Sequence, residues 1–231
     1  MIQSIAIITA RGGSKRIPKK NCKEFCGKPI IAYSIQAALD SGIFSEVMVS
    51  TDDIQIKKIA LEYGASVPFL RSPDTSGDYA STAEVLQEVL LEYKKLGKEF
   101  TYLCCLYPTA PFVTPEKIRT AMELLQKEQA DTVLPVVPFS FPPQRALVMK
   151  EGRAKILFPQ EYQKRSQDLE LEYHDAGQFY CFQTAAFIKT GKVITDNTRT
   201  IVLDEMEVQD IDNESDWALA ELKYQKLIEK R

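Results

Sequence analysis

The sequence predicts an α/β fold in which a mostly parallel sheet lies between layers of helices. Short apolar runs rich in β-branched residues alternate with longer segments of helical periodicity, and the links between them are short. This alternation is typical of parallel strands joined by crossover helices. The chain has 231 residues, of which 45% are hydrophobic and 26% charged, enough to bury one core. We therefore expect a single domain over residues 1–231.

The first strand is expected at residues 4–10, where a nearly continuous apolar run is typical of a central strand buried on both faces. Pro29 then opens a helix that ends at Ser41 and Gly42. Further strands are predicted at residues 47–50, 67–70, 102–106, 132–137, 178–182 and 200–203. Helices are predicted at residues 54–63, 82–96, 115–128 and 215–228, the last capped by Asn213 or Ser215.

Residues 138–173 interrupt the alternation of strands and helices. Prolines and phenylalanines gather at its start, and short apolar runs follow between turn residues. We therefore expect an inserted arm rather than another strand–helix unit. Two interpretations of its aromatic and proline residues stay open, namely packing within the chain and contact with a second subunit.

Composition excludes several classes of protein. The formal net charge of -3 argues against a dedicated nucleic-acid-binding protein. No stretch approaches the ~20 consecutive apolar residues of a membrane helix, and residues 1–10 lack a basic leader, so we expect a cytoplasmic protein. The five cysteines include no CxxC pair, which argues against a zinc site or a disulfide framework.

Residues 10–21 form a basic, glycine-containing loop directly after the first strand, at the carboxyl edge of the sheet where open α/β folds bind ligands. Gly12 and Gly13 allow a tight turn that presents N–H groups, Ser14 adds a hydroxyl, and Arg11 and Lys15 add positive charge. N–H groups, a hydroxyl and positive charge are what a loop needs to bind a triphosphate. The loop is not a P-loop, since that motif requires glycine where Cys22 stands. The alternative is a solvated basic turn.

The loop sequence 11–21 reads RGGSKRIPKKN, and further phrases follow in order: GKPI at 27–30, VSTDD at 49–53, PFLR at 68–71, AST at 80–82, PTAP at 108–111, DAG at 175–177 and DID at 210–212. Together they resemble the CMP-acidic-sugar synthetases over nearly the whole chain. This resemblance implies a Rossmann-like nucleotidyltransferase fold that uses CTP. Arg16 and the phrases at 141–147, 165–169 and 173–180 are most similar to the branch of that family that activates pseudaminic acid.

Asp210 and Asp212 stand at i and i+2, so in an extended segment both carboxylates point to one face and suit Mg²⁺. The pair could equally be solvated or cap the next helix. The resemblance favours the metal, because the family holds its ion at this place. Asp52 and Asp53 could also be ligands, but the pattern favours a helix N-cap.

The resemblance also implies roles for other residues. For CTP these are Arg11, Gly12, Gly13, Ser14, Lys15, Lys20, Asn21, Arg71 and Thr82, and for the sugar they are Arg16, Tyr107, Arg165, His174 and Gln178. Tyr107 stands where sialic acid synthetases carry glutamine. A homodimer is implied as well, with the arm 138–173 crossing to the partner and bringing Arg165 to the neighbouring sugar site.

The expected reaction joins a nine-carbon acidic sugar to CMP, for glycosylation of surfaces or flagellin. Arg11, Lys15 and Asp212, with Mg²⁺, are expected to be catalytic because they offset negative charge as pyrophosphate leaves. The general base stays open between a water, Asp212 and the single histidine, His174. Alternatives are a synthetase for sialic or legionaminic acid, a nucleotide sensor, and a nucleic-acid-binding protein.

Overall fold

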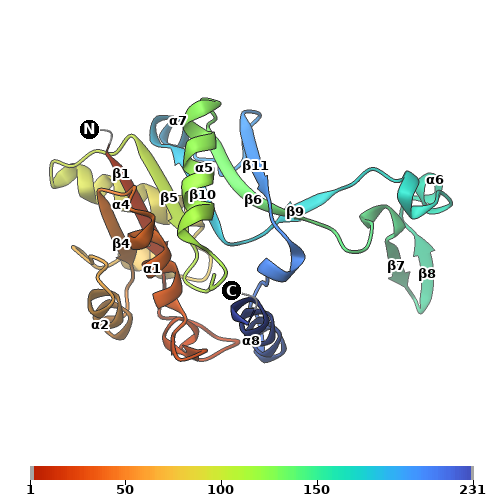
Figure 1. Ribbon diagram of the computed structural model, residues 1–231, viewed down its shortest axis with the longest axis horizontal. Helices are drawn as coiled ribbons and strands as arrows, with labels where there is room; N and C mark the ends of the chain where they lie inside the picture. Colours follow the sequence, from red (N-terminus) through yellow and green to blue (C-terminus); the bar gives the residue numbers. More distant parts are fainter. Residues whose placement is uncertain (1–2, 230–231) are drawn as a thin grey trace.

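The computed structural model describes residues 3–229. Within these residues the main sheet has seven strands in the order β11-β6-β10-β5-β1-β4, with β9 paired to β6 (Figure 1). Its strands are β1 Ser4–Thr9, β4 Glu46–Ser50, β5 Tyr102–Leu106, β6 Thr132–Pro138, β9 Tyr173–Asp175, β10 Phe179–Gln183 and β11 Thr198–Val202. The β1/β4, β1/β5 and β6/β11 pairs are parallel, so the predicted α/β class is confirmed.

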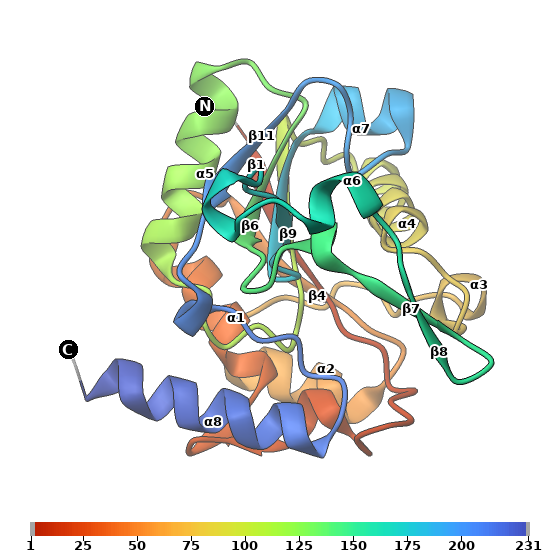
Figure 2. The same ribbon diagram turned by 90° about the vertical axis from the view of Figure 1, so that its right-hand side faces the viewer.

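Helices cover both faces of the sheet because successive side chains of the buried strands point in opposite directions. Ala6 and Ile8 of β1 belong to the core cluster formed with α1 Ile31–Ser41, α2 Ile54–Glu62 and α5 Pro115–Lys127. Ile5 and Ile7 belong to the opposite cluster, with α4 Thr82–Lys95 and α7 Thr184–Thr190. Figure 2 shows the sheet between these two layers.

The C-terminal helix α8, Glu214–Ile228, packs beside the segment that follows the basic loop, which comprises η1 Lys20–Cys22, β2 Glu24–Phe25 and β3 Lys28–Pro29. Trp217 and Ala220 are buried in one cluster with Phe25 and Tyr33. Asn213 is the N-cap, and its capping box with Asp216 fixes where the helix begins. The start of α8 is thereby held close to the basic loop.

The arm leaves the body as an antiparallel ribbon of β6 and β9, in which Val137 pairs with His174 and Pro138 with Tyr173. Beyond the ribbon lie η2 Pro143–Arg145, the hairpin of β7 Leu147–Lys150 and β8 Arg153–Ile156, α6 Pro159–Tyr162 and η3 Ser166–Asp168. Figure 1 shows that this segment projects away from the sheet and its helices. Residues 138–173, where the sequence predicts an inserted arm, therefore hold the end of β6, these small elements and the start of β9.

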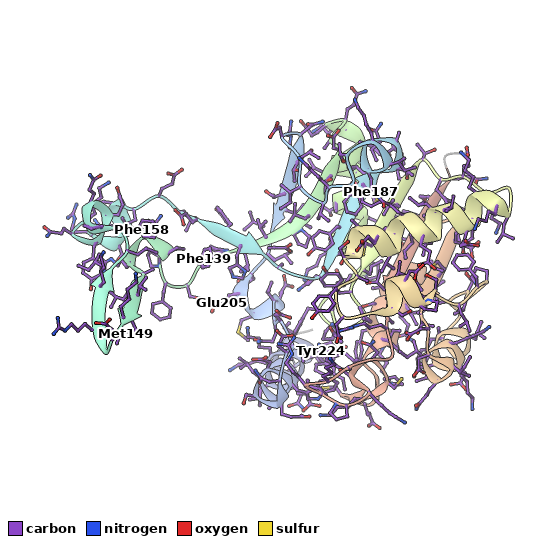
Figure 3. The ribbon with its side chains drawn as sticks, turned by 180° about the vertical axis from the view of Figure 1, so that it is seen from behind. Phe139, Met149, Phe158, Phe187, Glu205 and Tyr224 are labelled. Carbon is purple, nitrogen blue, oxygen red and sulfur yellow. The ribbon has the colours of Figure 1, made fainter. Side chains whose placement is uncertain are left out.

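Apolar side chains on the arm are open to solvent. Phe141 is 87% exposed and Met149 is 65% exposed, and Figure 3 shows Met149 and Phe158 far from the body. Leu147, Met149 and Ile156 share one face of the hairpin, since alternate residues of a strand point the same way. This apolar face is not covered by the rest of the described chain.

Three details of the prediction were wrong or incomplete. Residues 67–70 form no strand, because they lie beyond the bridge between Met48 and Ser66, and Pro68 has no N–H to donate. The short helices α3 Pro73–Ser76 and α7 were not foreseen. Strand β10 runs antiparallel to β5 and β6. No helix within residues 3–229 is long and apolar enough to cross a membrane.

Candidate functional site

The strands bring the predicted site to one edge of the sheet. Parallel strands β1, β4 and β5 end there at Thr9, Ser50 and Leu106. Because β10 is antiparallel, it begins at this edge, with Phe179 opposite Leu106. The arm also departs from this edge, since β6 runs antiparallel to β10. The reversed direction of β10 therefore places residues 173–178 at the same edge of the sheet as the basic loop.

The close approach of Gly12 to α2 fixes the basic loop. The Gly12 N–H donates to Asp52 Oδ1 at 2.9 Å, and a Cβ added at Gly12 would lie 2.9 Å from Cβ of Asp53. Asp53 is the N-cap of α2, where it accepts from the backbone of Gln55 and Ile56, so the predicted cap is confirmed. Only glycine fits between the strand and this capped helix.

The phosphate cations predicted in the loop converge on one carboxylate. The Arg11 guanidinium donates to Asp78 Oδ1 at 2.6 Å, and Lys15 Nζ donates to Asp78 Oδ2. The hydrogen bonds from Lys15 and Arg11 hold the pKa of Asp78 below its usual range. Arg11 and Lys15 therefore lie close enough together to bind one anionic group with both side chains.

Two other loop residues stabilise the loop itself in this structure. Ser14 Oγ donates to the carbonyl of Ile17 at 2.5 Å, and Asn21 Nδ2 donates to the carbonyl of Arg11 at 2.9 Å. Asn21 is buried, so its amide ties the end of the loop to its start. Its predicted contact with CTP would add to this supporting role.

The segment of Asp210 and Asp212 crosses directly over the loop. Lys20 Nζ donates to the carbonyl of Ile211 at 2.6 Å, and Arg16 pairs with Asp212 Oδ1 at 2.7 Å. Desolvation, followed by the neighbouring Asp212 charge, raises the pKa of Asp210. Burial lowers the pKa of Lys20, although both aspartates oppose that shift.

These two carboxylates fit Mg²⁺ by their chemistry. They offer hard oxygen donors, and their mutual repulsion is the kind that a divalent cation relieves. Within residues 3–229 no three His, Cys, Asp or Glu side chains gather as a metal site, so an ion held here would take further oxygens from a ligand or water.

Of the two predicted cytidine contacts, Arg71 lies beside the end of β4, and Thr82 begins α4 and lies beside Tyr107. Arg71 is only 8% exposed and donates to Ser50, through Nε to Oγ at 3.0 Å and through its terminal nitrogen to the carbonyl at 2.7 Å. Burial lowers the pKa of Arg71, yet a guanidinium stays charged. Thr82 Oγ1 lies 3.4 Å from the hydroxyl of Tyr107.

Tyr107 connects the cytidine side with the predicted sugar side. Its ring packs edge-on against Tyr180 at 5.5 Å, and its N–H donates to the carbonyl of Gln178 at 2.9 Å. Tyr180 donates to Asp175 Oδ2 at 2.7 Å, and burial, then Tyr107, raises the pKa of that phenol. Gln178 is 2% exposed, and its amide Nε2 donates to the carbonyl of Glu207 at 2.6 Å. Glu207 belongs to the short helix η4, Glu205–Glu207. Among the described residues, Gln178 Oε1 has no hydrogen-bond partner.

The remaining two sugar candidates belong to the arm and its base. His174 lies on β9, is exposed, and packs against Phe139 with ring centroids 4.8 Å apart. Arg165 lies in the arm beyond the ribbon and pairs with Asp168 at 2.8 Å. The structure therefore does not bring Arg165 into the cleft of its own chain.

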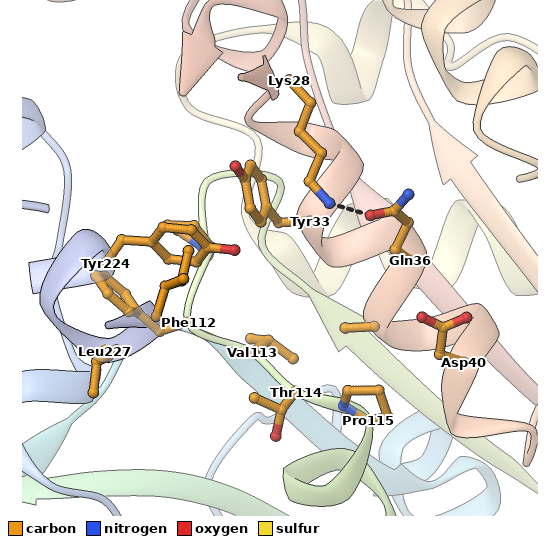
Figure 4. Close-up of a pocket in the computed structure, with 13 residues that line it drawn as sticks. Lys28, Tyr33, Gln36, Asp40, Phe112, Val113, Thr114, Pro115, Tyr224 and Leu227 are labelled. Carbon is orange, nitrogen blue, oxygen red and sulfur yellow. Dashed lines mark hydrogen bonds between the residues drawn. The ribbon is translucent and has the colours of Figure 1, made fainter. Parts of the chain in front are cut away.

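A cleft of about 350 Å³ opens over the loop, and its walls include Thr9, Pro108 and Thr109 besides the loop cations. A separate cavity of about 190 Å³ lies between α1, residues 111–115 and α8 (Figure 4). There the Lys28 ammonium lies 4.1 Å from the centre of the Tyr33 ring and donates to Gln36. Its described wall is mostly aromatic and apolar, without the concentrated positive charge that a triphosphate requires.

A basic, glycine-containing loop at the carboxyl edge of an α/β sheet, crossed by a segment with a carboxylate pair, is the arrangement expected of a nucleotide-binding enzyme. The Cytidylyltransferase family model matches residues 5–211, and the chain belongs to this family. It is 39% identical to a pseudaminic acid cytidylyltransferase of Campylobacter jejuni over 96% of this chain and 97% of that protein.

Two further likenesses are informative. The chain is 36% identical to a CMP-N,N'-diacetyllegionaminic acid synthase of Legionella pneumophila, over 94% of each chain. Its fold is similar to a solved CMP:2-keto-3-deoxy-manno-octonic acid synthetase complexed with CTP, with a TM-score of 0.68, 19% identity and coverage of 98% and 99% of the two chains. The predicted nucleotidyltransferase fold is thus confirmed.

Sequence reasoning missed three residues at this edge. Asp78 lies in a turn rich in serine and glycine, where an acid gives no signal of its own. Asp175 and Tyr180 fall inside a phrase that was noted only for its resemblance, and their hydrogen bond depends on the antiparallel entry of β10. A complementary charge for Arg11 and Lys15 could have been sought, but not located, from the sequence.

Proposed function

We propose that this protein transfers the CMP moiety of CTP to pseudaminic acid, giving CMP-pseudaminic acid and diphosphate. The observation that carries the proposal is the 39% identity, along nearly the whole chain, with an enzyme named for this activity. The convergence of Arg11 and Lys15 on one anionic group supports the nucleotide half of the reaction. The product would serve glycosylation of surfaces or flagellin.

In this reaction the anomeric hydroxyl of the sugar attacks the α-phosphorus of CTP, and pyrophosphate leaves opposite. Positioning and charge neutralisation dominate such transfers. Arg11 and Lys15 would bind the departing phosphates, and Lys20, which donates to the Ile211 carbonyl, would add a further positive charge. Arg71 is positioned by Ser50 beside the cytidine side of the cleft.

Asp210 and Asp212 would hold Mg²⁺, which neutralises phosphate charge when it is bound. Arg16 now pairs with Asp212 and would exchange that partner for the sugar or the phosphate. The repulsion between the two aspartates, which contributes to the raised pKa of Asp210, supports a cation at this point. The proton of the sugar hydroxyl would pass to water, Asp212 or His174.

The exposed apolar face of the arm supports a homodimer, in which the arm crosses to the partner and Arg165 reaches the neighbouring sugar site. The ion pair of Arg165 with Asp168 is exposed and therefore easily exchanged. The reaction uses soluble, charged substrates, and we place the enzyme in the cytoplasm.

The test is a pyrophosphate-release screen in which CTP is offered with pseudaminic, legionaminic, sialic and 2-keto-3-deoxy-octonic acids. The highest kcat/KM is expected with pseudaminic acid, because a pocket that pairs particular substituents rejects analogues that leave its polar groups unpaired. An equal or higher kcat/KM with sialic or legionaminic acid would mean that this acid, and not pseudaminic acid, is the preferred substrate. Release with none of them would contradict the transferase.

A further inference from the structure

Asp78 uses both of its carboxylate oxygens on the loop cations. Oδ1 accepts from Arg11 at 2.6 Å and Oδ2 accepts from Lys15. A phosphate group bound by the same two side chains would present its oxygens in the same manner. In this structure, then, the chain itself supplies an anion at the position where the nucleotide's phosphates are expected.

The segment that carries Asp78 is anchored at both ends, and its tip meets the basic loop through Asp78. Glu88 of α4 accepts from the Ser72 N–H at 2.8 Å and from Thr75 Oγ1, which anchors the start of α3. Ser81 caps α4 through its box with Glu84, which anchors the other end. Between these anchors lie residues 77–80, where Tyr79 is 101% exposed and therefore holds nothing in place.

We propose that Asp78 is an internal competitor for the polyphosphate, which must leave Arg11 and Lys15 when CTP binds and returns to them as pyrophosphate departs. The inference rests on the proposed function, because it takes Arg11 and Lys15 as the triphosphate cations. Exposed ion pairs are weak, so a triphosphate of higher charge can displace the carboxylate.

The competition has two consequences. The apparent affinity for CTP is reduced by the fraction of molecules in which Asp78 occupies the cations. The same occupation favours release of pyrophosphate, which would otherwise remain on two cations after the transfer. A purely supporting role, in which Asp78 merely holds the two cations in position, predicts the opposite effect on binding.

The experiment measures binding of CTP and of pyrophosphate by calorimetry, with the full-length protein, Mg²⁺ and no sugar. Asp78→Asn should bind both anions about 3- to 10-fold more tightly than wild type, the scale of two exposed ion pairs. Asp74→Asn is the matched control, since Asp74 lies in α3 of the same segment and, among the described residues, no hydrogen bond or ion pair joins it to the loop. It should bind as wild type does.

Equal or weaker binding by a folded Asp78→Asn variant, while wild type binds both anions, overturns the inference and leaves the proposed function standing. Wild-type protein that binds neither CTP nor pyrophosphate contradicts both. In turnover assays the variant should also be inhibited by lower pyrophosphate concentrations than wild type, and unchanged inhibition would count against the competitor.

Discussion

The basic loop and the arm differ in whether their side chains find partners within the chain. The loop concentrates positive charge, and the structure pairs it within one chain: Arg11 and Lys15 with Asp78, Arg16 with Asp212, and Lys20 with the Ile211 carbonyl. The arm presents apolar side chains such as Met149 that stay mostly exposed within residues 3–229. The difference teaches that the charges of the loop find partners within one chain, whereas the apolar face of the arm stays largely exposed in the described residues.

The largest effect is expected at the carboxylate pair in the nucleotide half. Asp212→Asn should lower turnover at least ~100-fold, because it removes a preorganised charge beside the reacting phosphate. EDTA should abolish turnover in the wild type. Steady-state kinetics with added Mg²⁺, alongside gel filtration to confirm an unchanged assembly, measure both.

Asp216→Asn is the matched control for this change of charge. Asp216 accepts from the N–H groups of Asp212 and Asn213, so its loss should cost about 1 kcal/mol of capping and lower the Tm, with turnover much nearer wild type. A well-folded Asp212→Asn enzyme with near-normal Mg²⁺-dependent activity would remove the metal from this position.

The next effect concerns the loop cations. Lys15→Ala and Arg11→Ala should each lower kcat/KM for CTP about 10- to 100-fold, the scale of a lost charged hydrogen bond. Lys19→Ala serves as the control, because Lys19 donates to Gln55 at 3.1 Å instead of joining the cation pair. Equal kinetics for all three variants and wild type would make the loop an ordinary solvated turn.

The arm should respond differently. Met149→Asp places a charge on the apolar face shared with Leu147 and Ile156, so the dissociation constant of the proposed dimer should increase at least ~10-fold, measured by sedimentation. Sugar-dependent turnover should fall, while calorimetric CTP binding stays unchanged. Lys155→Ala, on the other face of the hairpin, should alter neither. A wild type that is monomeric, or a sugar KM that stays the same when the dimer dissociates, would contradict this difference between the loop and the arm.

The smallest effect is expected at the arm's base. His174→Ala should raise the sugar KM about 3- to 10-fold, the scale of one neutral hydrogen bond, and leave the KM for CTP alone. His174 lies on β9 and not in the basic loop. A change in the sugar KM without a change in the CTP KM would therefore show that the sugar-binding part of the site begins at β9. A rise in the CTP KM instead would place His174 in the nucleotide half.

Local patterns predicted most of the fold because they act within a few residues. Gly42 ends α1 in a left-handed conformation, and Asp53 caps α2, both as the sequence indicated. The direction of β10 could not be predicted, since a buried strand has the same apolar pattern in either direction. Residues 67–70 carry strand-like side chains, but they lie beyond the bridge at Ser66 and Pro68 cannot donate to a neighbour.

The candidate site, like the fold, could be predicted only where a local pattern marks it. The loop could be located because glycines and cations adjoin a buried strand, and its cations do converge. Asp78 could not, because its position depends on how α3 packs against Glu88, a contact between residues that no local pattern joins. The contact of Tyr180 with Asp175 likewise follows from where an antiparallel strand begins.

The ribbon of β6 and β9 has a consequence for the thermodynamics of assembly. A segment attached by a single flexible strand would lose much conformational entropy on docking with a partner, whereas this arm is a hydrogen-bonded extension of the sheet. Its direction is set before any partner arrives, so less freedom is lost on association. Glycine at Pro138 or Tyr173, the outermost pair of this ribbon, should therefore weaken the self-association proposed for the arm by making the arm more flexible.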